Sequence, residues 1–231
     1  MESPSLHERW LAWSLDRFSV LLGLVVLNYV VLMLLPDDHL AVAAGATAVC
    51  ATTLYALDAA GAHRKVRIAV RGILVSLVVM AFLFFGGVPG MRPVISLIFA
   101  ATLAVGMYVV VRRLFGHENF SVTTLTAAVS VYVLLGLVFA ELFIAAAQIG
   151  PMEPFVDQIA DPTRSDLIYL SYITLTTVGF GDLTPRSGVA RTLIITEALI
   201  GQIFLVTAVA RVVSLFGSNQ TKASSGEDLG G

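Results

Sequence analysis

Long uncharged stretches dominate the chain, and short polar connections separate them. Five stretches contain no Asp, Glu, Lys or Arg and a sixth contains three such residues; they are residues 18–35, 40–57, 72–91, 93–111, 119–140 and 189–216. A helix needs about 20 mostly apolar residues to cross the hydrocarbon core of a bilayer. The pattern therefore predicts an all-α membrane protein with six transmembrane helices.

The polar start of the chain has the pattern of a surface helix. Ser5 and Glu8 have the spacing of a capping box at a helix N-terminus. One face of the following turns is apolar and carries two tryptophans, which favour the headgroup region of a membrane; it consists of Leu6, Trp10 and Trp13. Residues 1–17 are therefore predicted to form an amphipathic helix at the membrane interface.

Composition argues against a large soluble helical protein. Charged residues make up 13% of the chain and hydrophobic residues 57%, whereas about 25% of residues are charged in soluble domains. The single cysteine, Cys50, has no partner for an intrachain disulfide and is expected to pack as a small apolar side chain. Residues 218–231 are polar and glycine-rich, which predicts a disordered cytoplasmic tail. We expect neither a regulatory ligand domain nor a nucleic-acid partner.

The distribution of Lys and Arg predicts the orientation of the chain. If both termini are cytoplasmic, the inner connections hold most of the basic residues, namely Arg9, Arg64, Lys65, Arg67, Arg112, Arg113 and Lys222. The outer side then holds only Arg92, Arg164, Arg186 and Arg191, among several acids. Because cytoplasmic loops are enriched in Lys and Arg, both termini are predicted to be cytoplasmic. The membrane that the chain crosses is expected to be the cell (plasma) membrane.

The connection between the fifth and sixth spans is too long for a simple turn. Residues 149–166 contain three prolines and several acids, which indicates an exposed, non-helical rim. The segment DLIYLSYITLTT begins at Asp166, is expected to be capped by Ser165, and is long enough for about three helical turns. It is too short to cross the membrane and return, so it is predicted to be a re-entrant pore helix.

The next segment, TVGFGD, is predicted to leave the helix because it contains Gly179 and Gly181. Non-helical backbone at membrane depth survives only where protein buries it or where it lines a watery pore. A dehydrated cation is a suitable partner for its carbonyl groups. Glycines at alternate positions allow successive carbonyls to point the same way, and the Thr177 hydroxyl adds one more oxygen at the inner end.

Residues 177–181, followed by Asp182 and Pro185, resemble the selectivity filter of tetrameric potassium channels, for which TVGYG is the usual sequence. Phe180 stands where that sequence has tyrosine, a variant familiar in the family. The resemblance covers residues 121–216 and implies a pore domain over residues 117–217 of a homotetramer. K+ would be the permeant ion, with no other cofactor. It would be bound by the Thr177 hydroxyl and by the backbone carbonyls of Thr177, Val178, Gly179, Phe180 and Gly181.

The same resemblance assigns supporting roles around the filter. The candidates for filter support are Asp182, Tyr169, Thr176 and Glu197. Many family members carry paired tryptophans in the pore helix, the first of which braces the aspartate; here Tyr169 and Leu170 occupy these positions, and only Tyr169 has a hydroxyl to donate. Some members also keep a glutamate behind the filter, where this chain has Ile173. Gly201 is similar in placement to the hinge glycine of the last span, although close helix packing is an alternative reason for it.

Two carboxylates fall inside predicted spans, where ionisable groups are costly and usually paired or functional. Glu141 resembles a glutamate that channel proteins often keep near the outer end of the fifth span; the alternative is an interfacial residue that reaches water. Glu197, in the outer half of the sixth span, is a candidate for hydrogen bonding behind the filter in its protonated form. Its sequence position does not identify a partner.

Six spans with a pore loop after the fifth also resemble voltage-gated channel subunits. A conventional sensor needs arginines at every third position through the fourth span, and residues 93–111 contain none. Residues 18–116 are therefore predicted to be a sensor-like four-helix domain without gating arginines. The channel is not expected to be driven by a conventional voltage sensor.

Three other functions fit parts of the pattern. A six-span intramembrane protease needs a nucleophile and a base, but residues 186–188 are no Gly-x-Ser-x-Gly elbow and no histidine lies inside a late span, so an enzyme is not expected. A potassium transporter subunit carries four pore loops in one chain, whereas this chain has one. A weakly selective monovalent cation channel remains the alternative to a potassium-selective channel.

Overall fold

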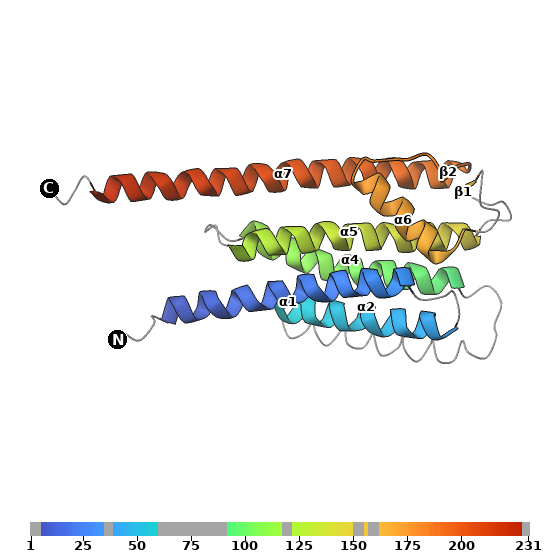
Figure 1. Ribbon diagram of the computed structural model, residues 1–231, viewed down its shortest axis with the longest axis horizontal. Coiled ribbons are helices and arrows are strands. Elements are labelled where there is room, and N and C mark those ends of the chain that lie inside the picture. The colour runs from blue at the N-terminus through green and yellow to red at the C-terminus, as the bar shows by residue number, and fades with distance from the viewer. Residues whose placement is uncertain are drawn as a thin grey trace.

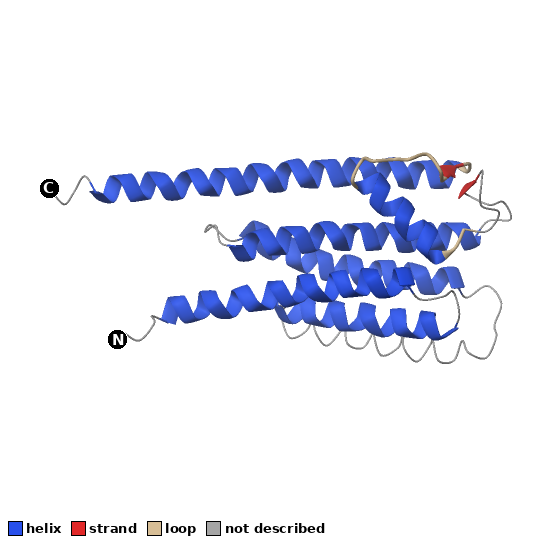
Figure 2. Cartoon of the chain, in the orientation of Figure 1, coloured by secondary structure: helices blue, strands red, loops and turns tan. Residues whose placement is uncertain are grey.

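The structure is a computed structural model that describes residues 6–34, 39–59, 92–116, 122–149, 155–156 and 162–227. Its helices are α1 (Leu6–Leu34), α2 (His39–Ala59), α4 (Arg92–Gly116), α5 (Val122–Ile149), α6 (Arg164–Leu175) and α7 (Gly188–Glu227). Two short strands, β1 (Phe155–Val156) and β2 (Thr184–Pro185), form an antiparallel pair. Figure 2 shows that helices make up nearly all of the described chain, as the sequence predicts.

The long helices lie side by side, and α5 is at the centre (Figure 1). It contacts α1, α4, α6 and α7, and most of its side chains are buried. Residues from α1, α4, α5 and α6 share one core cluster, which includes Leu21, Leu103, Leu134 and Ile168. The helices of the predicted sensor-like domain therefore pack directly on the helices of the predicted pore domain within one chain.

Three described helices are long and apolar enough to cross a membrane, namely Pro93–Arg112, Thr124–Ile149 and Gly188–Arg211. The second predicted span falls within α2, and the first falls within α1 except for Leu35, which lies outside the described residues. The third predicted span, residues 72–91, lies outside the described residues, so the count of six stays a prediction. The first residue of α1 and the last of α7 lie at the same end of the molecule (Figure 1), which is the relationship expected if both termini are on one side.

Both ends of the described chain belong to longer helices than the sequence indicates. The predicted interfacial helix is not a separate element, because α1 runs without a break from Leu6 to Leu34; Ser5, its expected cap, lies outside the described residues. The predicted disordered tail is helical as far as Glu227, since α7 continues through residue 218. No proline interrupts either helix, so nothing in the backbone ends them where the side chains change from apolar to polar.

Candidate ion-conduction site

The helix α6 slants between α5 and α7 (Figure 1), and it begins two residues earlier than the sequence indicates. Its N-cap is Thr163 and not Ser165, because Thr163 and Asp166 form a reciprocal capping box. Thr163 Oγ1 accepts from the Asp166 N–H at 3.3 Å, and Asp166 Oδ2 accepts from the Thr163 N–H at 2.8 Å. Thr163 and Ser165 are both residue types that cap helices, and only the spacing to Asp166 distinguishes them.

Backbone carbonyls of α5 anchor the middle of α6. The Tyr172 hydroxyl donates to the Val133 carbonyl at 2.8 Å, and Ser171 Oγ lies 2.7 Å from the Gly136 carbonyl oxygen. A Cβ atom at Gly136 would lie 2.7 Å from the ring of Tyr172, so a glycine is required for this close approach. Tyr29 from α1 makes a T-shaped contact with the same Tyr172 ring, with 4.8 Å between ring centroids.

An ion pair fixes the N-terminal end of α6. Glu141 of α5 is 2% exposed and pairs with Arg164, the first residue of α6. The interpretation of Glu141 as an interfacial residue that reaches water is therefore wrong. The sequence did not identify Arg164 as the partner, although it is the one basic residue between Gln148 and Asp182.

After α6 the backbone turns back on the end of the helix. The Val178 and Gly179 N–H groups both donate to the Ile173 carbonyl, at 2.9 and 3.1 Å, and the Thr177 N–H donates to the Thr174 carbonyl at 3.0 Å. Three alternate residues have positive φ angles: Thr177 at 60°, Gly179 at 52° and Gly181 at 79°. The expectation that both glycines adopt dihedrals unfavourable for other residues is thus confirmed. Thr177 carries a side chain in the same region, which costs about 1–3 kcal/mol.

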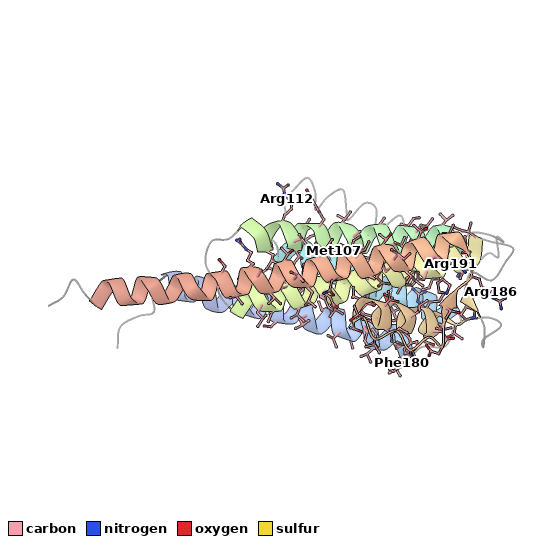
Figure 3. All side chains as sticks on the ribbon, turned by 90° about the horizontal axis from the view of Figure 1, so that it is seen from above. Met107, Arg112, Phe180, Arg186 and Arg191 are labelled. Atoms are coloured by element: carbon pink, nitrogen blue, oxygen red, sulfur yellow. The ribbon has the colours of Figure 1, made fainter. Side chains whose placement is uncertain are left out.

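The carbonyl groups of this segment differ from its N–H groups in their partners. Among the described residues, none of the carbonyl oxygens of residues 177–181 accepts a hydrogen bond. Val178 is 53% and Phe180 72% exposed in the single chain, and Figure 3 shows Phe180 at the margin of the molecule. The segment therefore has its acceptors available, on a surface that the single chain does not cover.

Tyr169 contacts the residue that follows the segment. Its hydroxyl donates to Asp182 Oδ2 at 2.8 Å, and its ring is stacked with Phe180, with 6.5 Å between centroids and 4° between planes. The hydrogen bond to Asp182 raises the pKa of the Tyr169 phenol above its ordinary value. Leu170 and Ile173 are buried in an apolar cluster, so among these three residues of α6 only Tyr169 braces the aspartate.

The remaining predicted site residues lie along α6 and α7. Glu197 is 0% exposed, and its Oε1 lies 2.6 Å from Ser171 Oγ, so it contacts the middle of α6; its role in filter support stays a prediction. Thr176 is the C-cap of α6, and its hydroxyl donates to the Tyr172 carbonyl at 2.6 Å. A Cβ atom at Gly201 would lie 2.5 Å from Leu175 Cδ1. This contact supports the packing interpretation of Gly201, and its role as a hinge stays a prediction.

The two short strands join the predicted rim to the segment that follows residues 177–181. Phe155 pairs with Pro185 and Val156 with Thr184. Arg191 Nε, on the first turns of α7, donates to the Pro185 carbonyl at 3.2 Å, and Figure 3 places Arg186 and Arg191 at this end of the molecule. The sequence predicted a non-helical rim here but no strand pairing, because two-residue strands leave no detectable alternation of side chains.

Comparison with known protein families gives a match in the second half of the chain. A family model described as "Ion channel" matches residues 120–218, which contain α5, α6, residues 177–181 and most of α7. No curated protein and no solved structure matches the chain. The match supports a place in an ion-channel family and a transport function in preference to an enzymatic one. Together with the apolar helices it indicates a membrane protein.

Proposed function

We propose that the chain is one subunit of a homotetrameric channel that conducts K+ passively across the cell membrane. The backbone of residues 177–181 carries this proposal. Its N–H groups near the helix end are bound to α6, its φ angles are positive at alternate residues, and its carbonyl oxygens accept no hydrogen bond among the described residues. Rings of such carbonyls replace the hydration shell of K+ in potassium channels.

The tetramer follows from the number of filter segments. One chain supplies one segment, and a closed ring around an axis needs several, which identical subunits provide through cyclic symmetry. The exposed surfaces of Val178, Phe180 and the apolar side chains of α7 support an assembly that covers them; those of α7 include Ile195, Leu199, Ile203, Val206 and Val209. Lipid accounts for the part of α7 that faces outward.

A weakly selective monovalent cation channel is the second candidate. The observation that favours it is the small number of side chains that brace the proposed filter. Phe180 has no hydroxyl, and Leu170 has no donor where many potassium channels carry tryptophan. Tyr169 alone of these residues holds Asp182. Loose bracing allows the carbonyl ring to adapt to a second cation. Helix α4 carries no arginine between Pro93 and Val111, so neither candidate is expected to have a conventional voltage sensor.

The proposal is tested by uptake of a potassium tracer into liposomes that contain the purified protein. We expect uptake driven by an outward K+ gradient, and its loss in Gly179→Ala, because alanine does not favour the positive φ of that residue. Gly23→Ala is the matched control, since nothing lies within 4 Å of a Cβ atom there and the residue is inside a helix. Equal uptake by the wild type and Gly179→Ala would contradict the proposal.

A further inference from the structure

Three oxygen atoms from three helices form a short chain behind α6. Glu197 Oε1 of α7 lies 2.6 Å from Ser171 Oγ of α6, and Ser171 Oγ lies 2.7 Å from the Gly136 carbonyl oxygen of α5. Glu197 and Ser171 are both 0% exposed. Both separations are hydrogen-bond distances for O–H···O contacts, so each needs a proton.

The number of protons determines the state of Glu197. A carbonyl oxygen only accepts, and a serine hydroxyl carries one proton. If the carboxyl group were ionised, that single proton would have to serve both contacts, and two oxygens would face each other without one. A neutral carboxylic acid supplies the missing proton. Glu197 then donates to Ser171, and Ser171 donates to the Gly136 carbonyl.

The surroundings of Glu197 provide no positive charge among the described residues. The titratable groups that face it are the phenols of Tyr132 from α5 and Tyr172 from α6, and each donates its proton to a backbone carbonyl. On α7, the helix that carries Glu197, the Arg191 side chain donates to the Pro185 carbonyl. Arg211 is about 20 Å from Glu197 along the axis of the same helix. Glu197 Oε2 has no hydrogen-bond partner in the described part of the chain. A buried carboxylate without a cation is costly, which favours the neutral acid.

We propose that Glu197 is held as a neutral carboxylic acid and positions α6 through a relay from Glu197 to Ser171 to the Gly136 carbonyl. Ile173, two residues beyond Ser171, accepts the N–H groups of Val178 and Gly179, so a shift of α6 displaces the filter segment. Loss of the Glu197 proton breaks the relay and loosens α6 between α5 and α7. The effect on conduction rests on the proposed function, whereas the protonation and the helix contacts do not.

The protonation is tested by infrared absorption of the purified protein in lipid at neutral pH. We expect a carboxylic-acid C=O band that is absent in Glu197→Gln and moves to higher frequency in Ser171→Ala. Glu141→Gln is the matched control and should leave the band in place, because Glu141 is paired with Arg164. Ser171→Thr keeps a hydroxyl and should also keep the band. An unchanged acid band in Glu197→Gln, or no such band in the wild type, overturns the proposal.

The positioning role is tested by the melting temperature as a function of pH. The neutral acid is the stabilising form, so the wild type should lose stability as alkaline pH removes the proton. Glu197→Gln keeps an N–H donor for Ser171 and should lack that step. Glu197→Leu has no donor and should be less stable than Glu197→Gln at every pH. A step of equal size in the wild type and Glu197→Gln overturns the role. Ion flux should decline in parallel with the wild-type step; absence of flux in every variant, with the melting result intact, counts against the channel function alone.

Discussion

The hydroxyl of Tyr132 donates a hydrogen bond to the carbonyl oxygen of Leu175 at 2.8 Å. Leu175 is the last residue of α6, and the final carbonyls of a helix have no partner within the helix. Tyr132 of α5 therefore supplies a hydrogen-bond partner at the end of the short helix that precedes residues 177–181. The Tyr132 ring is also stacked with Phe204 of α7, with 6.3 Å between centroids, so one side chain joins three helices.

Replacing this tyrosine isolates the hydrogen bond. Tyr132→Phe keeps the ring contact with Phe204 and removes the donor, so the Leu175 carbonyl loses its partner. We expect a loss of about 1 kcal/mol in the free energy of unfolding, measured by denaturant titration in detergent. Tyr108→Phe, at an exposed position, serves as the control. Equal stability of Tyr132→Phe and the wild type would show that the bond does not hold α6.

Breaking the ion pair between Glu141 and Arg164 is expected to lower the free energy of unfolding more than the loss of the Tyr132 hydrogen bond. Arg164→Gln leaves the buried Glu141 carboxylate without its counter-ion, which costs about 3 kcal/mol or more. The double variant with Glu141→Gln removes both charges and should recover most of that loss. Arg112→Gln, whose guanidinium is exposed and lies over the Tyr108 ring, should cost about 1 kcal/mol or less. If the double variant is as unstable as Arg164→Gln, the loss of stability in Arg164→Gln does not come from the unpaired Glu141 carboxylate.

The two interpretations of Gly201 predict different rescue behaviour. Gly201→Ala should reduce K+ flux in either case. If the glycine is needed for packing, its new methyl group displaces Leu175 Cδ1, which would be 2.5 Å away. Leu175→Val removes that atom and should restore flux in the double variant. If Gly201 is a hinge, the smaller residue at position 175 gives no rescue. The comparison is a double-mutant cycle on liposome flux.

The contact of Tyr169 with Asp182 is expected to control selectivity. Tyr169→Phe removes the hydrogen bond and keeps the ring stacked with Phe180, so the ratio of potassium to sodium uptake should fall. Phe180→Leu removes the stacking and keeps the hydrogen bond, which separates the two contributions. Because the bond raises the pKa of Tyr169, it is present at neutral pH and is lost only as alkaline pH passes that raised value. Unchanged uptake ratios in Tyr169→Phe would exclude this bracing.

The sequence predicted α6 and the backbone of residues 177–181 well because both depend on local chemistry. A short apolar segment between two spans and glycines at alternate positions are visible without a structure. The partners of Glu141 and Glu197 were not predictable in the same way. Arg164 is 23 positions from Glu141 and Ser171 is 26 positions from Glu197, and only the packing of α5, α6 and α7 brings them together.

The helix ends were predicted poorly for a different physical reason. Polarity marks where a chain is expected to leave the membrane, but it does not end a helix. Pro4 and Pro36 flank α1, and no proline follows Pro185, so the backbone of both terminal helices can continue through polar sequence. The choice of Thr163 over Ser165 as the cap depends on one spacing, because Asp166 is three residues after Thr163, as a capping box requires, but only one residue after Ser165.

The reversal potential between potassium and sodium solutions most directly tests whether residues 177–181 select K+. The protein is placed in a planar bilayer with potassium chloride on one side and an equal concentration of sodium chloride on the other. A potassium-selective filter predicts a reversal potential displaced far from zero in the direction set by K+, with the current blocked by barium and lost in Gly179→Ala. A reversal potential close to zero would contradict potassium selectivity and would support the weakly selective cation channel.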